Sequence, residues 1–179
     1  MKLFTYLAAF LFAASACTQT TEMESVKTDS EPTHSKLVAT VMPVGDSNVS
    51  GSVTFTASEN GVQVTGNFEG LEPGNHGFHI HEYGDCTAED GTSAGGHFNP
   101  AENNHGAPSD MERHMGDLGN IEVNENGSAA VDFADQTVTL DQIIGRGIII
   151  HAGEDDFESQ PTGAAGSRVA CGVIGVAQK

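Results

Sequence analysis

The chain has 179 residues, which is enough for one domain with a substantial hydrophobic core. Its formal net charge is −18, from 7 basic and 25 acidic residues, and this disfavours binding to nucleic acid because no basic stripe is available to neutralise phosphates. The absence of Trp, the 22 Gly and the frequent alternation of Thr and Val favour short strands and turns over long helices.

The N-terminal part of the chain has the pattern of an export signal followed by a tether. In residues 1–16, Lys2 precedes an apolar run that ends in small residues, which is typical of a secretory signal and short for a membrane span. The sequence Ala14-Ser-Ala-Cys17 also resembles a bacterial lipoprotein cleavage box, in which the cysteine becomes the first residue and carries lipid. We expect either lipidation of Cys17 or cleavage of a plain signal nearby, and we favour a lipid-anchored chain in the periplasm or cell envelope. Residues 17–35 are polar and contain too few apolar side chains to fold, so they are predicted to be a flexible tether.

Residues 36–179 alternate between strand-like runs and turn signals and are predicted to form the folded domain. Strands are expected at 37–42, 51–57, 62–68, 77–82, 117–123, 129–133, 146–151 and 169–176. Glu59-Asn-Gly61 and Glu125-Asn-Gly127 are hairpin signals between neighbouring strands. Residues 84–115 form a long stretch without periodicity, which is typical of a functional loop. About eight short strands of this kind predict an all-β antiparallel sandwich or barrel.

Six of the eight histidines lie in a pattern that an ordinary hydrophobic core has no reason to produce. His79 and His81 stand two residues apart in a strand-like run, so their side chains project from the same face and can ligate one metal ion. The other four are His97, His105, His114 and His151. Neutral imidazole suits copper and zinc, and a carboxylate added to histidines, such as Asp117, suits zinc.

Four stretches, in this order, resemble the copper/zinc superoxide dismutase family over roughly residues 38–178. They are His76-Gly-Phe-His-Ile-His-Glu-Tyr-Gly-Asp85, Gly95-Gly-His-Phe-Asn-Pro100, Arg113-His-Met-Gly-Asp-Leu-Gly-Asn120 and Gly166-Ser-Arg-Val-Ala-Cys-Gly-Val-Ile-Gly175. The resemblance implies an eight-stranded antiparallel Greek-key β-barrel with long metal-binding and channel loops. It also implies dismutation of superoxide to O₂ and hydrogen peroxide by alternating Cu(II)/Cu(I) chemistry, with zinc in a structural role.

The resemblance further implies a role for each residue of the metal centre. Copper would be held by His79, His81, His97 and His151. Zinc would be held by His97, His105, His114 and Asp117, so that His97 bridges the two metals and takes part in catalysis. Asp155 would link a copper ligand to a zinc ligand, with Asp156 as the alternative one residue along, and His76 would be a structural residue and not a ligand.

Arg168 is implied to lie beside the open position of copper, where its fixed charge and donor fork suit a small anion. The chain departs from eukaryotic-type members in the loop before this arginine, because residues 152–167 contain four acidic residues and no Lys or Arg. Steering of superoxide would therefore come from Arg168 and the metals, or from a lysine elsewhere. A second departure is the longer stretch between Cys86 and His97, into which Asp90-Gly91 is inserted.

Export would permit a disulfide, and Cys86 and Cys171 are then the natural pair because Cys17 belongs to the leader. The resemblance implies the same pairing, and two buried free thiols are the alternative. Residues 143–146 and 172–176 resemble the dimer contact of eukaryotic-type members, which modestly favours a homodimer.

Two other functions are compatible with such a fold. One is a copper-binding or copper-delivery module, although related chaperones usually lack some of the copper ligands or the arginine. The other is an interaction protein that uses the sandwich surface and keeps a vestigial site. The complete set of ligand positions favours the enzyme. Because the chain is strongly acidic, no nucleic acid is expected as a partner. A membrane is expected as a partner only through the lipid anchor.

Overall fold

The computed structural model describes residues 33–178, and the predictions for the signal, Cys17 and most of the tether lie outside them. The strands are β1 (Lys36–Pro43), β2 (Ser50–Ser58), β3 (Gly61–Glu69), β4 (Gly74–His81), β5 (Asp117–Val123), β6 (Ala129–Asp135), β7 (Gly147–His151), β8 (Arg168–Val173) and β9 (Gly175–Val176). Two single-turn elements accompany them, the 3₁₀ helix η1 (Thr92–Ala94) and α1 (Leu140–Ile143). Among these described residues no helix is long and apolar enough to cross a membrane.

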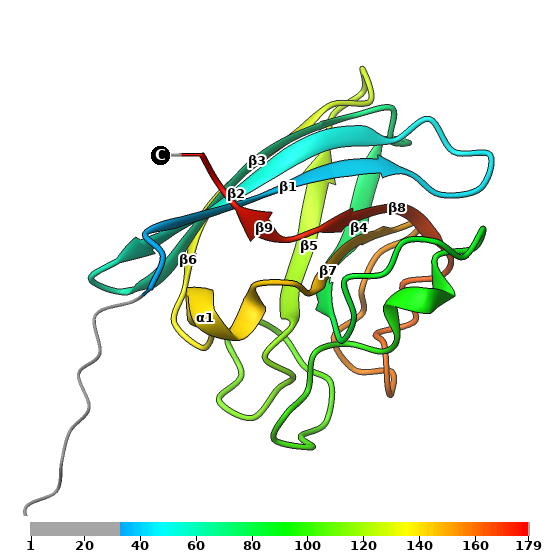
Figure 1. The fold of residues 1–179 in the computed structure, drawn as a ribbon. Helices are drawn as coiled ribbons and strands as arrows, with labels where there is room; N and C mark the ends of the chain where they lie inside the picture. Colours follow the sequence, from blue (N-terminus) through cyan, green and yellow to red (C-terminus); the bar gives the residue numbers. More distant parts are fainter. Residues whose placement is uncertain (1–32, 179) are drawn as a thin grey trace, which may run out of the picture. The chain divides into compact units, whose positions relative to one another are not determined.

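The strands form a nearly closed antiparallel barrel. Neighbouring strands follow the order β5-β4-β7-β8-β1-β2-β3-β6, with β9 paired to β1 (Figure 1). The chain crosses between the two halves of the barrel at the β3–β4, β5–β6 and β6–β7 connections, and the strands that these connections join are not paired with each other. This arrangement confirms the all-β Greek-key barrel predicted from the sequence.

Alternation of side chains explains how the barrel is filled. In β3, Val62, Val64 and Phe68 are buried while the residues between them are half-buried or exposed, apart from Gly66. The Phe68 ring meets the Phe78 ring edge-on across the interior, with 5.6 Å between the ring centres. Each such aromatic side chain contributes roughly 1.5–3 kcal/mol through burial.

Strands β4 and β7 differ from the rest because both of their faces are buried. Phe78 and Ile80 belong to the main hydrophobic core, so His79 and His81 project from the opposite face. The loop after β4 and the loop after β7 lie beside each other and cover that opposite face (Figure 1). The site is therefore built outside the barrel and under loops, on strands that the core holds in place.

The last predicted strand, 169–176, is divided in two in the structure. Ile174 breaks the ladder because its N–H donates to Arg146 O at 2.9 Å and its carbonyl accepts from Gly145 N–H at 2.7 Å. Before the break β8 pairs with β7 and with the end of β1, and after it β9 pairs with the start of β1. The segment predicted as one strand thus contributes β8 to one half of the barrel and β9 to the other.

A disulfide ties the loop after β4 to the barrel. Cys86 and Cys171 are bonded, with their Cα atoms 5.8 Å apart, as the sequence predicted. Cys86 packs with Val44, Ala94 and Ile149 in a small apolar cluster separate from the main core. The loop is therefore fixed at one point before it passes over the histidines.

Candidate metal centre

The paired strands β4 and β7 bring three of the predicted copper residues to one face. His79 lies opposite Ile149 and His81 opposite Gly147, so His151 at the end of β7 projects beside them. His97 joins them from the loop through a single bridge to His81. All four side chains are at most 4% exposed, and one ligand atom from each lies within 4.8 Å of the others.

Each of these four histidines has a buried ring nitrogen without a hydrogen-bond partner among the described residues. The atoms are His79 Nδ1, His81 Nε2, His97 Nε2 and His151 Nε2. A buried polar atom left unpaired costs about 1–3 kcal/mol, and four such atoms in one place are not expected by chance. Imidazole nitrogens that face one another suit a metal that prefers such donors, so this group fits copper.

The second ring nitrogen of three of these histidines is held by a fixed acceptor. His79 Nε2–H donates to Asp155 Oδ2 at 2.7 Å, His81 Nδ1–H to Gly95 O at 3.0 Å, and His151 Nδ1–H to Gly166 O at 3.2 Å. Each bond places the proton away from the group and leaves the facing nitrogen with a free lone pair. The surroundings therefore select the tautomer that can bind a metal.

A second group of ligand atoms surrounds one carboxylate oxygen. Asp117 Oδ1 lies 2.7 Å from His97 Nδ1, 3.1 Å from His105 Nδ1 and 3.2 Å from His114 Nδ1. A tetrahedral ion with ligands at about 2.0–2.1 Å separates those ligands by roughly 3.3 Å, so the spacing fits zinc. The other oxygen, Asp117 Oδ2, accepts from the Gly106 and His114 backbone N–H groups, which fixes the carboxylate.

His97 belongs to both groups. Its Nε2 is one of the unpartnered nitrogens of the first group, and its Nδ1 faces Asp117 in the second. Both ring nitrogens of an imidazole can serve as ligands only when flanking cations make loss of both protons favourable. The position of His97 therefore joins the two groups into one centre.

Asp155 connects the two groups from the opposite side. Its Oδ2 accepts from His79 and its Oδ1 from His105 Nε2–H at 2.8 Å, and the side chain is 1% exposed. Asp156, the alternative that the sequence left open, is exposed and accepts from the Ser159 hydroxyl and backbone instead. The structure thus places Asp155, and not its neighbour, between the two groups.

Three further residues position this centre, a role that the sequence analysis assigned to none of them. The Asn120 amide exchanges two hydrogen bonds with the Asp155 backbone, at 2.8 and 2.9 Å. The Gln160 amide does the same with the backbone of His105, at 2.8 and 2.9 Å. A Cβ at Gly163 would lie only 2.6 Å from His105 Nε2, and still nearer to Asp155. Asn120 ends one of the four matched stretches, whereas Gln160 had no local signal.

The segment before His114 is anchored to the barrel by a buried ion pair. Arg113 Nη2 donates to Asp135 Oδ2 at 2.6 Å and its Nη1 donates to Thr137 Oγ1 at 3.1 Å.

His76, which was predicted to be structural, has its Nδ1 2.7 Å from His151 O and its Nε2 2.8 Å from Glu72 O. It therefore lies outside both ligand groups and braces the backbone of one of them.

Burial favours the neutral, metal-binding form of His81, His97 and His151. Desolvation lowers the pKa of His97 to about 4 and that of His151 to about 3, and it holds the pKa of His81 well below its ordinary value. Desolvation also acts to lower the pKa of His105, but hydrogen bonds to Asp117 and Asp155 raise it to about 9. Against the effect of burial, the hydrogen bond from His105 helps to hold the pKa of both carboxyls below the usual range.

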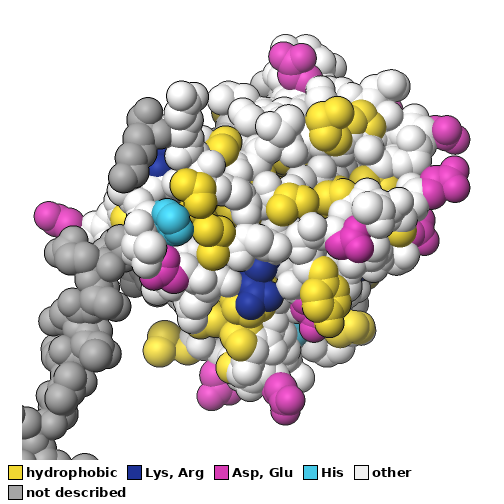
Figure 2. All heavy atoms as spheres, in the orientation of Figure 1, with side chains coloured by type: hydrophobic (Ala, Val, Ile, Leu, Met, Phe, Trp, Pro, Cys, Tyr) yellow, Lys and Arg dark blue, Asp and Glu magenta, His cyan; other side chains and the backbone are white. Residues whose placement is uncertain are grey.

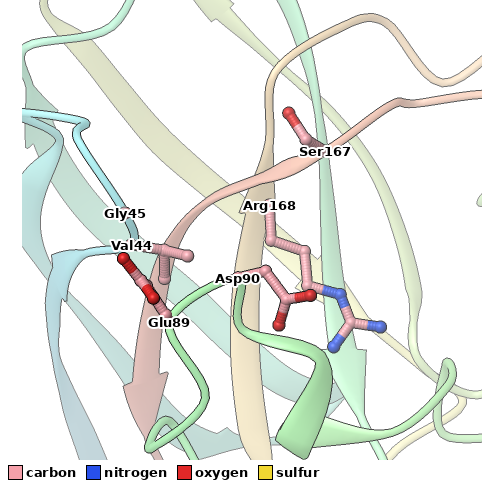
Figure 3. A pocket seen from close by; sticks show the side chains of 6 residues that line it. All are labelled: Val44, Gly45, Glu89, Asp90, Ser167 and Arg168. Carbon is pink, nitrogen blue, oxygen red and sulfur yellow. The ribbon is translucent and has the colours of Figure 1, made fainter.

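Arg168 lies beside the first group. It is paired with His151 across β7 and β8, and its guanidinium donates to Gly91 O and to Gly95 O, each at 2.5 Å. The arginine lines a cavity of about 540 Å³ on the outer side, drawn in Figure 3. Its positive charge is thus fixed close to His81 and His151.

Comparison with known proteins agrees with this geometry. The sequence model of copper/zinc superoxide dismutase (SODC) matches residues 49–174. This chain belongs to the copper/zinc superoxide dismutase family. A superoxide dismutase [Cu-Zn] of Cryptococcus neoformans var. grubii serotype A is 47% identical over 150 residues, which cover 77% of this chain and 97% of that protein. An extracellular superoxide dismutase [Cu-Zn] of Brugia pahangi is 43% identical over 148 residues, which cover 76% of this chain and 74% of the relative.

A solved structure has the same fold. The crystal structure of the clock protein EA4 is 41% identical, covers 81% of this chain and 96% of its own, and superposes with a TM-score of 0.75. As a copper/zinc superoxide dismutase, the chain has copper and zinc as its cofactors and superoxide as its substrate. The disulfide and the extracellular relative are consistent with export.

Proposed function

We propose that the chain dismutates superoxide at a copper ion held by His79 Nδ1 and by Nε2 of His81, His97 and His151. Zinc is held by Nδ1 of His97, His105 and His114 together with the Asp117 carboxylate. The observation that carries this assignment is His97, whose Nε2 lacks a partner in one group while its Nδ1 faces Asp117 in the other. Asp117 Oδ1 also lies near Nδ1 of His105 and His114, so His97 Nδ1 faces a second full set of ligand atoms and not a lone carboxylate partner.

When bound, copper supplies one-electron oxidation and reduction, and zinc supplies charge and rigidity without redox chemistry. The chain's own residues then bind the anion and move its protons. Arg168 attracts and orients superoxide with a guanidinium that two carbonyl groups hold in place. His97 can hold a proton at Nε2 when that nitrogen does not bind copper, and can then pass the proton on. The surrounding loops exclude bulk water from the ring, which is 4% exposed. Two superoxide ions and two protons yield O₂ and hydrogen peroxide.

Replacing the arginine tests the proposal, because Arg168 meets the substrate and not the metals. Purified protein loaded with both ions should dismutate superoxide. Arg168→Ala should lower the rate about tenfold or more while copper and zinc content stay at one each per chain, and Arg168→Lys should restore part of the rate. The copper-delivery alternative would be favoured if the fully metal-loaded protein did not dismutate superoxide but transferred its copper to an acceptor protein.

We also propose that the chain is exported and anchored through lipid on Cys17. Support comes from the charged start, the apolar run and the small residues of 1–16, and from the disulfide that export permits. In cells, the full-length chain should fractionate with membranes and incorporate labelled fatty acid, and Cys17→Ser should abolish that incorporation. A parent chain that is already soluble would instead indicate cleavage of a plain signal.

A homodimer is the third proposal. Large hydrophobic side chains are 44–59% exposed on neighbouring strands and on the loop after β4, at Met42, Tyr83, Val173 and Val176. On the face that carries β8 and β9, hydrophobic side chains gather while acidic ones lie mostly toward the rim (Figure 2). Sedimentation should give twice the chain mass, and Val173→Glu should give the mass of one chain. A parent protein that sediments as a monomer at high concentration would refute the dimer.

A further inference from the structure

The cavity outside Arg168 contains negative charge as well as the arginine. Its lining residues are Val44, Gly45, Glu89, Asp90, Ser167 and Arg168, and Figure 3 shows the Asp90 side chain beside that of Arg168. The dismutase chemistry assigns no task to these carboxylates. The charges of Asp90 and Arg168 act on each other, so an anion that approaches the guanidinium meets a negative charge beside it.

The loop that carries Asp90 also holds the arginine. Gly91 and Gly95, which accept from the two Nη atoms, flank the turn of η1. Gly91 has a φ of 72°, and a Cβ there would lie 3.2 Å from Arg168 Cδ, so the loop backbone is pressed against the arginine stem. The position of the guanidinium therefore depends on the shape of this turn.

Asp90 closes that turn with its side chain. Its Oδ1 accepts from the Thr92 backbone N–H at 3.0 Å and from the Thr92 hydroxyl at 2.6 Å. These hydrogen bonds, with a smaller contribution from the charge of Arg168, lower the pKa of Asp90, so the carboxylate is ionised at neutral pH. Glu89 lines the same cavity, but Asp90 alone of the two is joined to the turn that holds the guanidinium.

We propose that Asp90 is a rate-setting residue that opposes the capture of anions by Arg168. The inference rests on the proposed role of Arg168 with superoxide. A unit charge beside the guanidinium repels an approaching anion over a distance set by the Debye length, which is roughly 30 Å at 0.01 M salt and 8 Å at 0.15 M. Asp90 belongs to the inserted Asp90-Gly91 pair, so this chain carries a charge there in addition to its acidic loop at 152–167.

The charge and the turn can be separated by two variants. Asp90→Asn keeps an oxygen that can accept from Thr92 and removes the negative charge. Asp85→Asn is the matched control, because Asp85 lies in the same loop and accepts from the Thr87 backbone and hydroxyl at 2.9 and 2.7 Å in the same way. Asp85 does not line the Arg168 cavity, so the control removes equal charge from the same loop at another place.

The expected result is a rise of about twofold in the second-order rate constant for superoxide with Asp90→Asn at about 0.01 M salt. The difference should shrink toward none at about 0.15 M, because screening removes the repulsion. Asp85→Asn should match the parent at both salt concentrations. Equal rates for Asp90→Asn and the parent at low salt, or an equal rise in the control, would overturn the proposal.

A second measurement does not depend on turnover. Azide, a small monovalent anion, can be titrated optically into the copper-loaded protein, and Asp90→Asn should bind it about twofold more tightly at low salt. A change in loop shape alone would not produce an effect that disappears with salt. If the parent fails to dismutate superoxide, the proposed function is wrong, and the azide titration still decides whether Asp90 repels anions at Arg168.

Discussion

Asp155→Asn should weaken metal binding, because an amide cannot replace this carboxylate. Oδ1 accepts from His105 and from the Phe157 backbone N–H at 2.8 Å, while Oδ2 accepts from His79 at 2.7 Å. An asparagine has one oxygen and one NH₂ group, so in either orientation an N–H faces the nitrogen of a histidine that needs an acceptor. The affected histidine loses the partner that fixes its tautomer and ring position.

Loss of such a partner commonly lowers metal affinity by about 10–100-fold, which corresponds to roughly 1.4–2.7 kcal/mol. We expect a loss of this size for at least one of the two ions, since Asp155 touches one residue from each ligand group. The assay is a competition titration of metal-free protein against a coloured chelator, carried out separately with copper and with zinc. Thermal unfolding of the metal-free protein shows whether the variant still folds.

Asp156→Asn is the control for this experiment. It removes the same charge one residue away, at an exposed side chain whose hydrogen bonds go to the Glu158 and Ser159 segment. Copper and zinc affinities of the control should equal those of the parent. If Asp155→Asn binds both ions as tightly as the parent, the reasoning that this carboxylate orients the ligands is wrong.

Three other outcomes follow from the geometry. His97→Ala should impair both copper and zinc binding, whereas His151→Ala should impair copper and spare zinc, as elemental analysis after reconstitution can show. Reducing the Cys86–Cys171 bond, which joins residues 85 apart, should lower the free energy of unfolding by about 4–5 kcal/mol in the chain-entropy treatment, and denaturant titration with an unchanged midpoint would contradict the estimate. The rate constant for superoxide should change little, or rise slightly, as salt increases from about 0.01 to 0.15 M, because Arg168 acts at short range in a strongly acidic chain. A steep fall in the rate constant would instead indicate a lysine near Arg168 that steers superoxide.

The strands could be predicted because apolar and polar residues that alternate in the sequence place their side chains on opposite faces of a strand. Residues 62–68 and 129–133 alternate in the sequence and lie within β3 and β6. The single turn of α1 was missed because four residues are too few to show a helical period, and the Thr139 backbone N–H that donates to Gln142 Oε1 at 2.9 Å is visible only in the structure. The break at Ile174 was missed for a similar reason, since its hydrogen bonds are made to residues far away in the chain.

The metal centre was predictable in its members and not in its arrangement. The spacing of His79 and His81 places both on one face of a strand, but nothing local relates them to His105 in an aperiodic loop. That relation came from resemblance to a family. The choice between Asp155 and Asp156 could be made only from the structure, because a one-residue shift in a turn reverses which carboxylate is buried. The backbone carbonyl groups that hold Arg168 could not be identified from the sequence, because every residue has one.

The pairing of the first described strand with the last two has a consequence for synthesis of the protein. Leu37 in β1 lies opposite Val176 in β9, and Met42 opposite Cys171 in β8. During translation, one edge of β1 stays open until the C-terminal strands arrive. Open strand edges pair readily with other chains, and contacts between distant residues form slowly. The nascent chain is therefore most prone to aggregation just before its last segment becomes available, and a chaperone that delays folding would act best by covering that edge.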